Sequence, residues 1–194
     1  QLYSTTDTPI NSLDELKNRK MWALYGESAD LLKNLGISPI TSPAVQVSES
    51  VSRGVVNGYF GLILESVIDF KTAPYTKSIT MFPLGVTSSG FSMFINKRKW
   101  GSISEADRNA IMKLSGEALA QRVGKASKAA SAAALSQLKA DGIQVIEADP
   151  QFYAELERAA TPSYEQFERT AEKAGLDGKA VLADFRKEYE ALAK

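Results

Sequence analysis

Aromatic and small residues stand where two predicted strands end, and their side chains are suited to binding rather than to covalent chemistry. Trp22 lies near the carboxyl end of the predicted strand 20–25, and Tyr25 closes that strand. A second run contains Tyr59 and ends at Gly61. Ligands of open parallel sheets bind outside the carboxyl ends of the strands. Because no basic group stands at these positions, we expect an apolar or aromatic ligand, or an amine held by cation–π contact.

Each of these aromatic residues also has a purely structural interpretation. A tryptophan in a buried strand, as Trp22 is predicted to be, belongs to the core at least as readily as it lines a pocket. Successive strand side chains point to opposite faces, so at most one of Tyr59 and Phe60 lines the site and the other belongs to the core. Tyr25 stands at the turn after its strand, where its hydroxyl is a candidate donor to a ligand.

Residues for the commonest kinds of catalysis are missing. The sequence contains no histidine and no cysteine. Thiol catalysis, disulfides, the usual zinc ligand sets and a Ser-His-Asp triad are therefore excluded. Carboxylate pairs such as Asp14/Glu15 and Glu188/Glu190 fall on predicted amphipathic surfaces, where solvation explains them. We predict a protein that is not an enzyme and that uses no metal and no cofactor.

The charge balance gives no sign of a nucleic-acid or membrane partner. Lysine plus arginine number 23 and aspartate plus glutamate number 23, for a formal net charge of zero. Nucleic-acid binding needs a concentrated basic face, and we interpret the strongest basic cluster, residues 97–99, as a solvated turn. No run approaches the roughly 18 apolar residues of a membrane span. The chain opens on Gln1 rather than Met, which indicates a mature product or a fragment, and the lack of cysteine suits an oxidising compartment.

Short helices alternate with strands over residues 13–64, which is the pattern of a parallel sheet with right-handed crossovers. Ser12 and Glu15 form a capping box at the start of the first helix. Ser28 is predicted to cap the second helix, and Gly36 to end it. The strands of this region are predicted at 20–25, 38–41 and 59–64, with a further helix at 45–53.

The remaining residues add a few strands and a largely helical second half. Further strands are predicted at 1–5, 77–82, 90–96 and 144–147, and residues 83–90 are a flexible connection that crosses between lobes. From Ser104 an apolar stripe predicts helix that continues to residue 138 and stops at Asp141. Pro162 breaks or restarts the helix after that, and an amphipathic helix closes the chain.

Several motifs follow one another in an order that resembles one family of binding proteins. The motifs are Leu13-Asp-Glu-Leu-Lys17, residues 20–23, Leu35-Gly-Ile-Ser-Pro39, Gly54-Val-Val-Asn-Gly58, Phe70-Lys71, Ile95-Asn-Lys97 and residues 100–107. From about Ser4 to the C-terminus the chain resembles the substrate-binding proteins of tripartite ATP-independent periplasmic (TRAP) transporters, the DctP-like family. That family carries a D-L-K-G-x-K-x-R strand, a G-x-x-P strand, a G-x-V-D-G turn and an N-K passage into a very long helix.

The resemblance implies an α/β fold of the periplasmic-binding-protein type. Two lobes surround a cleft that closes on a small ligand, and a long helix bridges them. Residues 10–90 are expected to form one nearly complete lobe. Residues 1–9 and 91–194 are expected to form part of the second lobe, the bridging helix and the C-terminal helices. Because the family has a half-lobe before the point where Gln1 stands, we expect a fragment whose exposed apolar surface drives self-association.

The resemblance also indicates ligand-binding positions, with large departures. Trp22 stands where the family has an arginine whose fork clamps a carboxylate. Gly61 stands where the family has an asparagine, and Ala44 is near a position that is often aromatic. Glu65 precedes Phe70-Lys71 as an acidic residue does in one branch of the family, where it would accept bonds from hydroxyls or an amine. The predicted ligand-binding residues are therefore Trp22, Tyr25, Tyr59, Gly61 and Glu65, and an organic-acid ligand is disfavoured.

The leading interpretation is a periplasmic solute-binding component of a TRAP transporter. Such a protein closes on its small-molecule solute and delivers it to the membrane permease subunits. The alternative is a helical interaction or scaffold module that binds no small molecule. The two interpretations differ in whether a ligand stabilises the full-length protein against unfolding.

Overall fold

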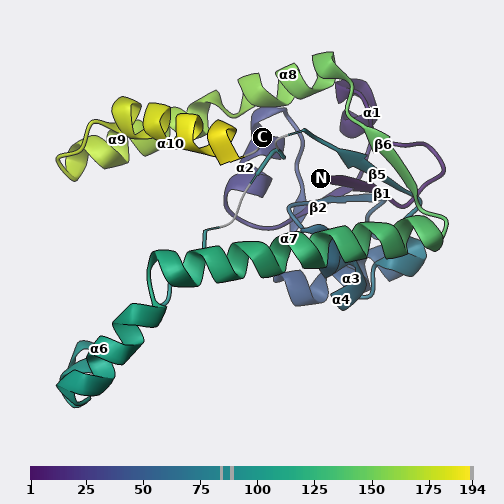
Figure 1. The fold of residues 1–194 in the computed structure, drawn as a ribbon. Helices are drawn as coiled ribbons and strands as arrows, with labels where there is room; N and C mark the ends of the chain where they lie inside the picture. The colour runs from purple at the N-terminus through teal and green to yellow at the C-terminus, as the bar shows by residue number, and fades with distance from the viewer. Residues whose placement is uncertain (84, 88–89, 193–194) are drawn as a thin grey trace.

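The chain folds around one six-stranded sheet with helices on both faces (Figure 1). The computed structural model describes residues 1–83, 85–87 and 90–192. The order of the strands is β3-β2-β4-β1-β5-β6. They are β1 (Leu2–Ser4), β2 (Met21–Ala23), β3 (Ile40–Thr41), β4 (Gly58–Phe60), β5 (Ser78–Met81) and β6 (Gln144–Glu147).

All strands except β1 run in one direction. β2 pairs in parallel with β3 and β4, and β5 pairs in parallel with β6. β1 lies between β4 and β5 and is antiparallel to both, so β4 and β5 share a direction too. The carboxyl ends of β2 to β6 therefore lie at one side of the sheet, which we call the carboxyl edge. Its last strand residues are Ala23, Thr41, Phe60, Met81 and Glu147.

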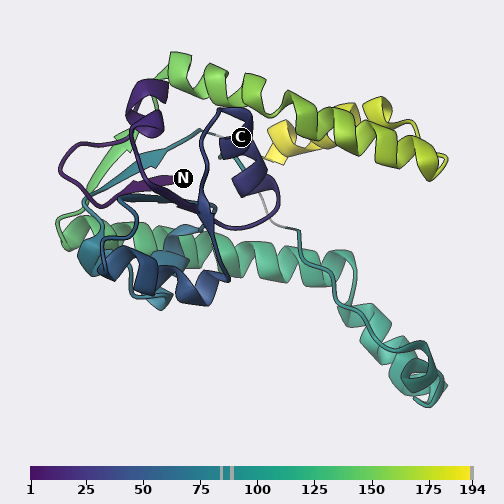
Figure 2. The same cartoon turned by 180° about the vertical axis from the view of Figure 1, so that it is seen from behind.

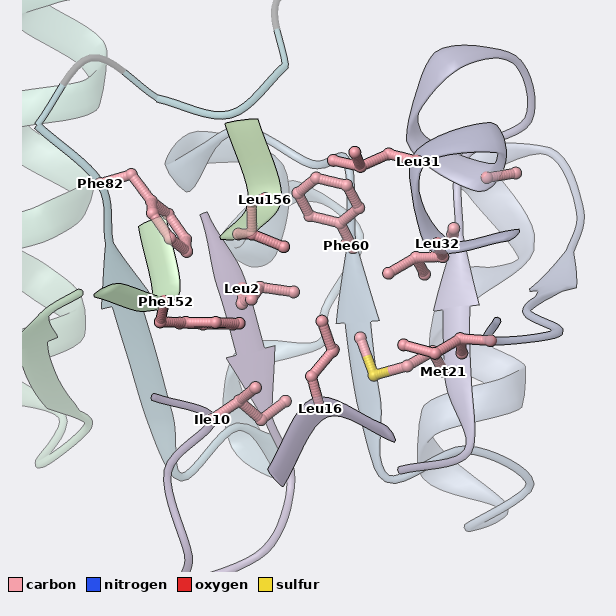
Figure 3. Close-up of a cluster of buried hydrophobic side chains, with 13 residues drawn as sticks. Leu2, Ile10, Leu16, Met21, Leu31, Leu32, Phe60, Phe82, Phe152 and Leu156 are labelled. Carbon is pink, nitrogen blue, oxygen red and sulfur yellow. The ribbon is translucent and has the colours of Figure 1, made fainter. Parts of the chain in front are cut away.

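The first face of the sheet carries an apolar core that Figure 3 shows in close-up. Leu2, Met21 and Phe60 project from the strands and are at most 1% exposed. Leu32 and Phe152 meet them from the covering helices. Burying side chains of this size contributes about 1.5–3 kcal/mol each. The helices on this face are α1 (Leu13–Lys17), α2 (Glu27–Asn34) and α8 (Pro150–Ala159).

The opposite face carries a second core made by the alternate strand residues. Tyr3, Trp22 and Tyr59 are all 0% exposed and point to this face. They pack with Val47 and Leu138. Figure 2 shows the same three-layer arrangement from behind, with the covering helices on the side away from α8. These helices are α3 (Val47–Ser52), α4 (Leu64–Asp69) and α7 (Glu117–Ala140).

The long helix α7 crosses the sheet and continues well beyond it (Figure 1). It has 24 residues, or about 36 Å at 1.5 Å per residue. Its C-terminal half packs on the second core through Ala134 and Leu138. The predicted helix from Ser104 is interrupted before α7, because Gly116 has a φ of 60° and N-caps the new helix. The helices away from the sheet are α5 (Lys97–Gly101), α6 (Glu105–Leu114), α9 (Thr161–Lys173) and α10 (Gly178–Leu192).

Local signals at the helix ends were mostly reliable. Ser12 caps α1, since its Oγ accepts from the Glu15 N–H at 3.1 Å. Glu15 closes the box one residue earlier than expected, because its carboxylate accepts from the Asn11 N–H at 2.7 Å. Gly36 follows the end of α2 at a φ of 79°, which is the predicted stop. The prediction that Ser28 caps α2 was wrong, because Gly26 is the N-cap and Ser28 lies inside the helix.

One larger prediction also needs correction. Residues 90–96 do not form a strand, since none of the described strands pairs with them and Phe91 and Phe94 are 94% and 89% exposed. The division into lobes 1–9/91–194 and 10–90 stays a prediction, and the sheet joins strands of both segments, since β1 pairs with β4 and β5 and β6 pairs with β5. The predicted crossing at 83–90 includes residues 84 and 88–89, which lie outside the described residues.

Candidate functional site

The carboxyl edge brings together exposed apolar side chains from three neighbouring connections. Tyr25 follows β2, Val45 follows β3 in the 3-10 turn η1 (Ala44–Gln46), and Ile63 follows β4. Their exposed fractions are 57%, 72% and 54%. Because β3, β2 and β4 are adjacent in the sheet, the three connections leave neighbouring strand ends, and we call Tyr25, Val45 and Ile63 the apolar region. An apolar region at the carboxyl edge is where an α/β sheet binds a ligand.

Trp22 lies beneath this region as part of the second core. It is 0% exposed and sits opposite Tyr59 on β4 and Ile40 on β3 in the sheet register. Its indole Nε1 donates to Ser42 Oγ at 2.9 Å. Ser42 immediately follows β3, so the tryptophan ties that connection to β2. The one polar atom of the indole is thereby satisfied by the protein itself.

The position before β2 does not replace the missing cation at the carboxyl edge. Arg19 donates from one guanidinium nitrogen to Thr6 Oγ1 and from another to the Thr8 carbonyl at 2.7 Å. Lys20 follows it at the amino end of β2. Both cations therefore lie at the side of the sheet opposite the carboxyl edge.

Tyr59 forms the centre of a buried aromatic pair. Its ring stacks on Tyr3 with centroids 4.5 Å apart and an angle of 6° between the planes. Since β1 and β4 are antiparallel, the two hydroxyls lie on the same face but point toward opposite ends of the strands. Tyr3 donates to the Leu62 carbonyl at 3.0 Å, near the carboxyl edge. The Tyr59 hydroxyl bonds Thr72 Oγ1 at 3.1 Å and Thr76 Oγ1 at 2.7 Å, near the amino end of β5.

Both tyrosines remain protonated at neutral pH. Burial raises the pKa of Tyr59 to about 12, against a smaller lowering by its hydrogen bonds with Thr72 and Thr76. Burial also raises the pKa of Tyr3 well above its ordinary value, and the nearby Tyr59 and Glu65 raise it further. The pair therefore acts as a neutral hydrogen-bonding layer under the site.

Gly61 holds the sharpest backbone constraint at the carboxyl edge. It follows β4 with a φ of 91°, a conformation that other residues adopt only with strain. A Cβ at this position would lie 2.6 Å from Ser28 Oγ and 2.9 Å from Ser28 Cβ. The asparagine expected at this position from the family pattern would collide with Ser28. Glycine is therefore required by close approach to α2 as well as by its dihedral angle.

Glu65 stands in the first turn of α4, beside the carboxyl edge. Its Oε2 accepts from Ser131 Oγ of α7 at 2.7 Å, in a partly buried position. The carboxylate also lies close enough to Tyr3 to raise the pKa of that phenol. Glu65 thus joins α4 to the long helix.

The structure brings together three of the predicted site residues, with a fourth beside them. Tyr25 and Gly61 follow strand ends at the carboxyl edge, Trp22 lies beneath it, and Glu65 flanks it. Tyr59 is fully buried and directs its hydroxyl away from this edge.

The residue types do not favour a metal centre here. Among the described residues, no three of the histidine, cysteine, aspartate and glutamate side chains gather closely enough to hold a metal ion.

Several residues of this region were missed in the sequence. Neither Val45 nor Ile63 was predicted as a site residue, and their exposure depends on the turn of each connection. Ser42 comes directly after a predicted strand, which is a usable signal, but its bond to Trp22 spans 20 positions. Ser28 was interpreted as a cap, which concealed that its side chain faces Gly61.

Comparison with known proteins identifies the class of protein to which this fold and edge belong. Residues 1–170 match the DctP family, described as bacterial extracellular solute-binding protein, family 7. The chain belongs to this family of TRAP-type solute-binding proteins. Among the helices of the described residues, none combines the length and the apolar character needed to span a membrane.

Two relatives show how far the likeness extends. The outer membrane transporter protein TsaT of Comamonas testosteroni is 32% identical over 178 residues, which cover 92% of this chain and 52% of the relative. A TRAP periplasmic solute-binding protein of Bordetella bronchiseptica, solved with bound (R)- and (S)-mandelate, is 28% identical with a TM-score of 0.84. The match covers 98% of this chain and 60% of that structure. The chain therefore spans between half and two thirds of the length of these relatives.

A more distant structure supports the fold alone. The TRAP solute-binding protein of Rhodoferax ferrireducens, in complex with copurified benzoate, is 21% identical with a TM-score of 0.78. The match covers all of this chain and 62% of that structure. The α/β architecture with its long helix is thus that of a periplasmic solute-binding protein.

Proposed function

We propose that the protein is the periplasmic solute-binding component of a TRAP transporter and that it captures a small aromatic solute at the carboxyl edge of its sheet. The observation that carries the proposal is the apolar region of Tyr25, Val45 and Ile63, which follows the ends of three adjacent strands. In a soluble protein such exposed apolar side chains mark a binding surface. The mandelate bound to the Bordetella bronchiseptica relative supports an aromatic solute of that size.

The proposed roles of the individual residues follow from their positions. Tyr25 is exposed and stacks on the solute or donates its hydroxyl to it. Gly61 lets Ser28 of α2 lie against the backbone at the end of β4. Trp22 supports the floor of the site from the core, and Tyr59 supports it from the same core without touching the solute. Glu65 holds α4 against α7 through Ser131 and accepts a bond from the solute only where that link opens.

The solute is proposed to pass from this protein to the membrane permease subunits of the transporter in the periplasm. Its relatives are solute-binding proteins, and in this role closure on the solute, not turnover, is the functional step. Self-association of the chain receives no support from the comparisons and stays a prediction.

Ligand-induced stabilisation of the full-length protein tests the proposal. We expect mandelate or benzoate to raise the unfolding temperature, because a ligand at a hundredfold excess over its Kd adds about 2.7 kcal/mol to the free energy of unfolding. Succinate and glucuronate serve as anionic controls that lack an aromatic ring. Stabilisation by the controls but not by any aromatic solute contradicts the proposal.

The alternative of a helical scaffold module without a small-molecule ligand is tested by the same measurement. That module predicts no stabilisation by any member of the solute panel. An enzyme, by contrast, would consume the bound aromatic solute, which chromatography of the solute after incubation detects.

A further inference from the structure

The amino end of α2 reaches the carboxyl edge with unused hydrogen-bond donors. The helix has eight residues and begins directly after the connection that follows β2. Its N-cap, Gly26, has no side chain and makes no side-chain cap bond. The Ala29 and Asp30 N–H groups bond the Leu24 and Gly26 carbonyls. Within the described part of the chain, the Glu27 and Ser28 N–H groups have no such acceptor.

Ser28 adds a side-chain donor at the same place. The residue is only 7% exposed, and its hydroxyl makes no hydrogen bond to any of the described residues. Its Oγ still reaches solvent, since Ser78 Oγ is the fully buried side-chain oxygen without a partner among the described residues, so an acceptor arriving from solvent can meet the Ser28 hydroxyl. Its Oγ would lie 2.6 Å from a Cβ on Gly61, which places it against the end of β4. Glycine at position 61 is what allows the serine to lie this close to the backbone.

The charges around this point leave it open to an anion. The amino end of a helix carries a partial positive charge from its free N–H groups. Asp30 is paired with Lys33 at 2.8 Å on the exposed side of the helix. Glu27 is exposed and lies in the same first turn, so its carboxylate is solvated rather than buried beside Ser28. The usual cation is absent, because Trp22 occupies its position and Arg19 is engaged at the other side of the sheet.

We propose that Ser28 Oγ and the Glu27 and Ser28 N–H groups form an oxyanion site that receives the carboxylate of an aromatic acid beside Gly61. The inference deepens the proposed function and rests on it. It assigns the carboxylate to neutral donors on α2 in place of a guanidinium on β2. The aromatic ring of the same solute then lies over the apolar region of Tyr25 and Ile63.

Binding of mandelate and of its uncharged amide, mandelamide, to the full-length protein tests this assignment. In the Ser28→Ala variant we expect the mandelate Kd to rise about tenfold or more, because a hydrogen bond to a charged group is lost. The mandelamide Kd should change less than threefold. Ser52→Ala is the matched control, since Ser52 is an exposed helical serine on α3 whose hydroxyl bonds only the Glu49 carbonyl at 3.3 Å.

Each outcome decides the assignment. A mandelate Kd that Ser28→Ala leaves unchanged overturns it, and so does an equal loss for mandelate and mandelamide. A wild-type protein that binds mandelamide but not mandelate also overturns the oxyanion site while leaving the proposed aromatic solute intact. A wild-type protein that binds neither overturns both. Unfolding temperatures of the ligand-free variants, expected to lie within a few degrees of wild type, confirm that the comparison concerns folded protein.

Discussion

At the residue scale, most of the predicted site residues that carry a polar side-chain atom are already hydrogen-bonded within the protein. The indole N–H of Trp22 already donates to Ser42, and the hydroxyl of Tyr59 is already hydrogen-bonded with Thr72 and Thr76. Neither residue offers a free polar atom to a solute. Exposed Tyr25 and the Ser28 hydroxyl, which has no partner among the described residues, stay available to recognise one.

Gly61→Ala is predicted to destabilise the protein by about 1–3 kcal/mol, because it combines a φ of 91° with a Cβ placed 2.6 Å from Ser28 Oγ. Urea unfolding of the full-length variant measures the change. Gly124→Ala is the matched control: it lies inside α7 with nothing within 4 Å of the added Cβ, so it should stabilise by about 0.5–1 kcal/mol. Equal effects at the two glycines would show that the close approach to Ser28 is not a constraint.

Trp22→Phe is predicted to lower the free energy of unfolding by about 1–3 kcal/mol, since it leaves a cavity and removes the bond to Ser42 Oγ. The matched control is Trp100→Phe on α5, which is outside both cores and should change stability by less than about 0.5 kcal/mol. Chemical denaturation of both variants gives the comparison. A Trp22 variant as stable as the Trp100 variant would contradict the buried position of Trp22.

The pKa of Tyr59 predicts a stability loss at high pH. An unfolded tyrosine releases its proton near pH 10, whereas folded Tyr59 keeps it until about pH 12. Over that window the native state binds more protons than the unfolded state, so stability is complete below pH 10 and falls as pH rises toward 12. The slope from one such group is at most about 1.4 kcal/mol per pH unit. Tyr3 contributes in the same direction.

Urea unfolding at pH 9 and pH 11 measures that slope. Tyr59→Phe is expected to be less stable than wild type at pH 9, because Thr72 and Thr76 lose their partner, and to lose less stability on going to pH 11. An identical pH slope in the two proteins would exclude Tyr59 as its source.

At the element scale, a helix end or strand was predicted correctly when the residues that define it lie close together in the sequence. Ser12 and Gly36 act within one turn of helix, and both were placed correctly from the sequence. The central position of β1 was not predictable, because the pairing of Leu2 with Phe60 and Thr80 joins segments nearly 60 and 80 residues apart. Residues 90–96 have the apolar composition of a strand, but composition cannot supply a neighbouring strand to pair with.

In the site too, features within one segment could be predicted and contacts between distant segments could not. The aromatic ends of β2 and β4 could be recognised in the sequence, since each lies within its own segment. Ser28 and Gly61 meet only because α2 folds back over β4, so their contact was invisible until the helix was placed.

The link between α4 and α7 is predicted to fix the long helix against the site. Ser131→Ala removes the donor to Glu65 Oε2, and we expect a loss of about 1 kcal/mol together with faster amide exchange in α4. Ser136→Ala is the control, because that hydroxyl bonds only the Ala132 carbonyl of its own helix. If both variants exchange as wild type does, the Glu65–Ser131 bond does not hold the two helices together.

At the scale of the whole molecule, one sheet with helices on both faces presents a single carboxyl edge to the solvent. The long helix α7 runs from one face of the sheet toward α6, and α9 and α10 extend beyond the sheet from its opposite face (Figure 1). Phe91, Met93 and Phe94 are among the most exposed apolar side chains of the described residues. Because the chain spans 52–60% of the length of its relatives, binding is best measured on the full-length protein.

The most direct test of the central claim is mass spectrometry of the solute released from full-length protein purified from its native host. The apolar region at the carboxyl edge, with Trp22 in place of a cation, predicts a small solute that contains an aromatic ring. Recovery of an aliphatic dicarboxylate or a sugar acid at one molecule per protein would contradict it.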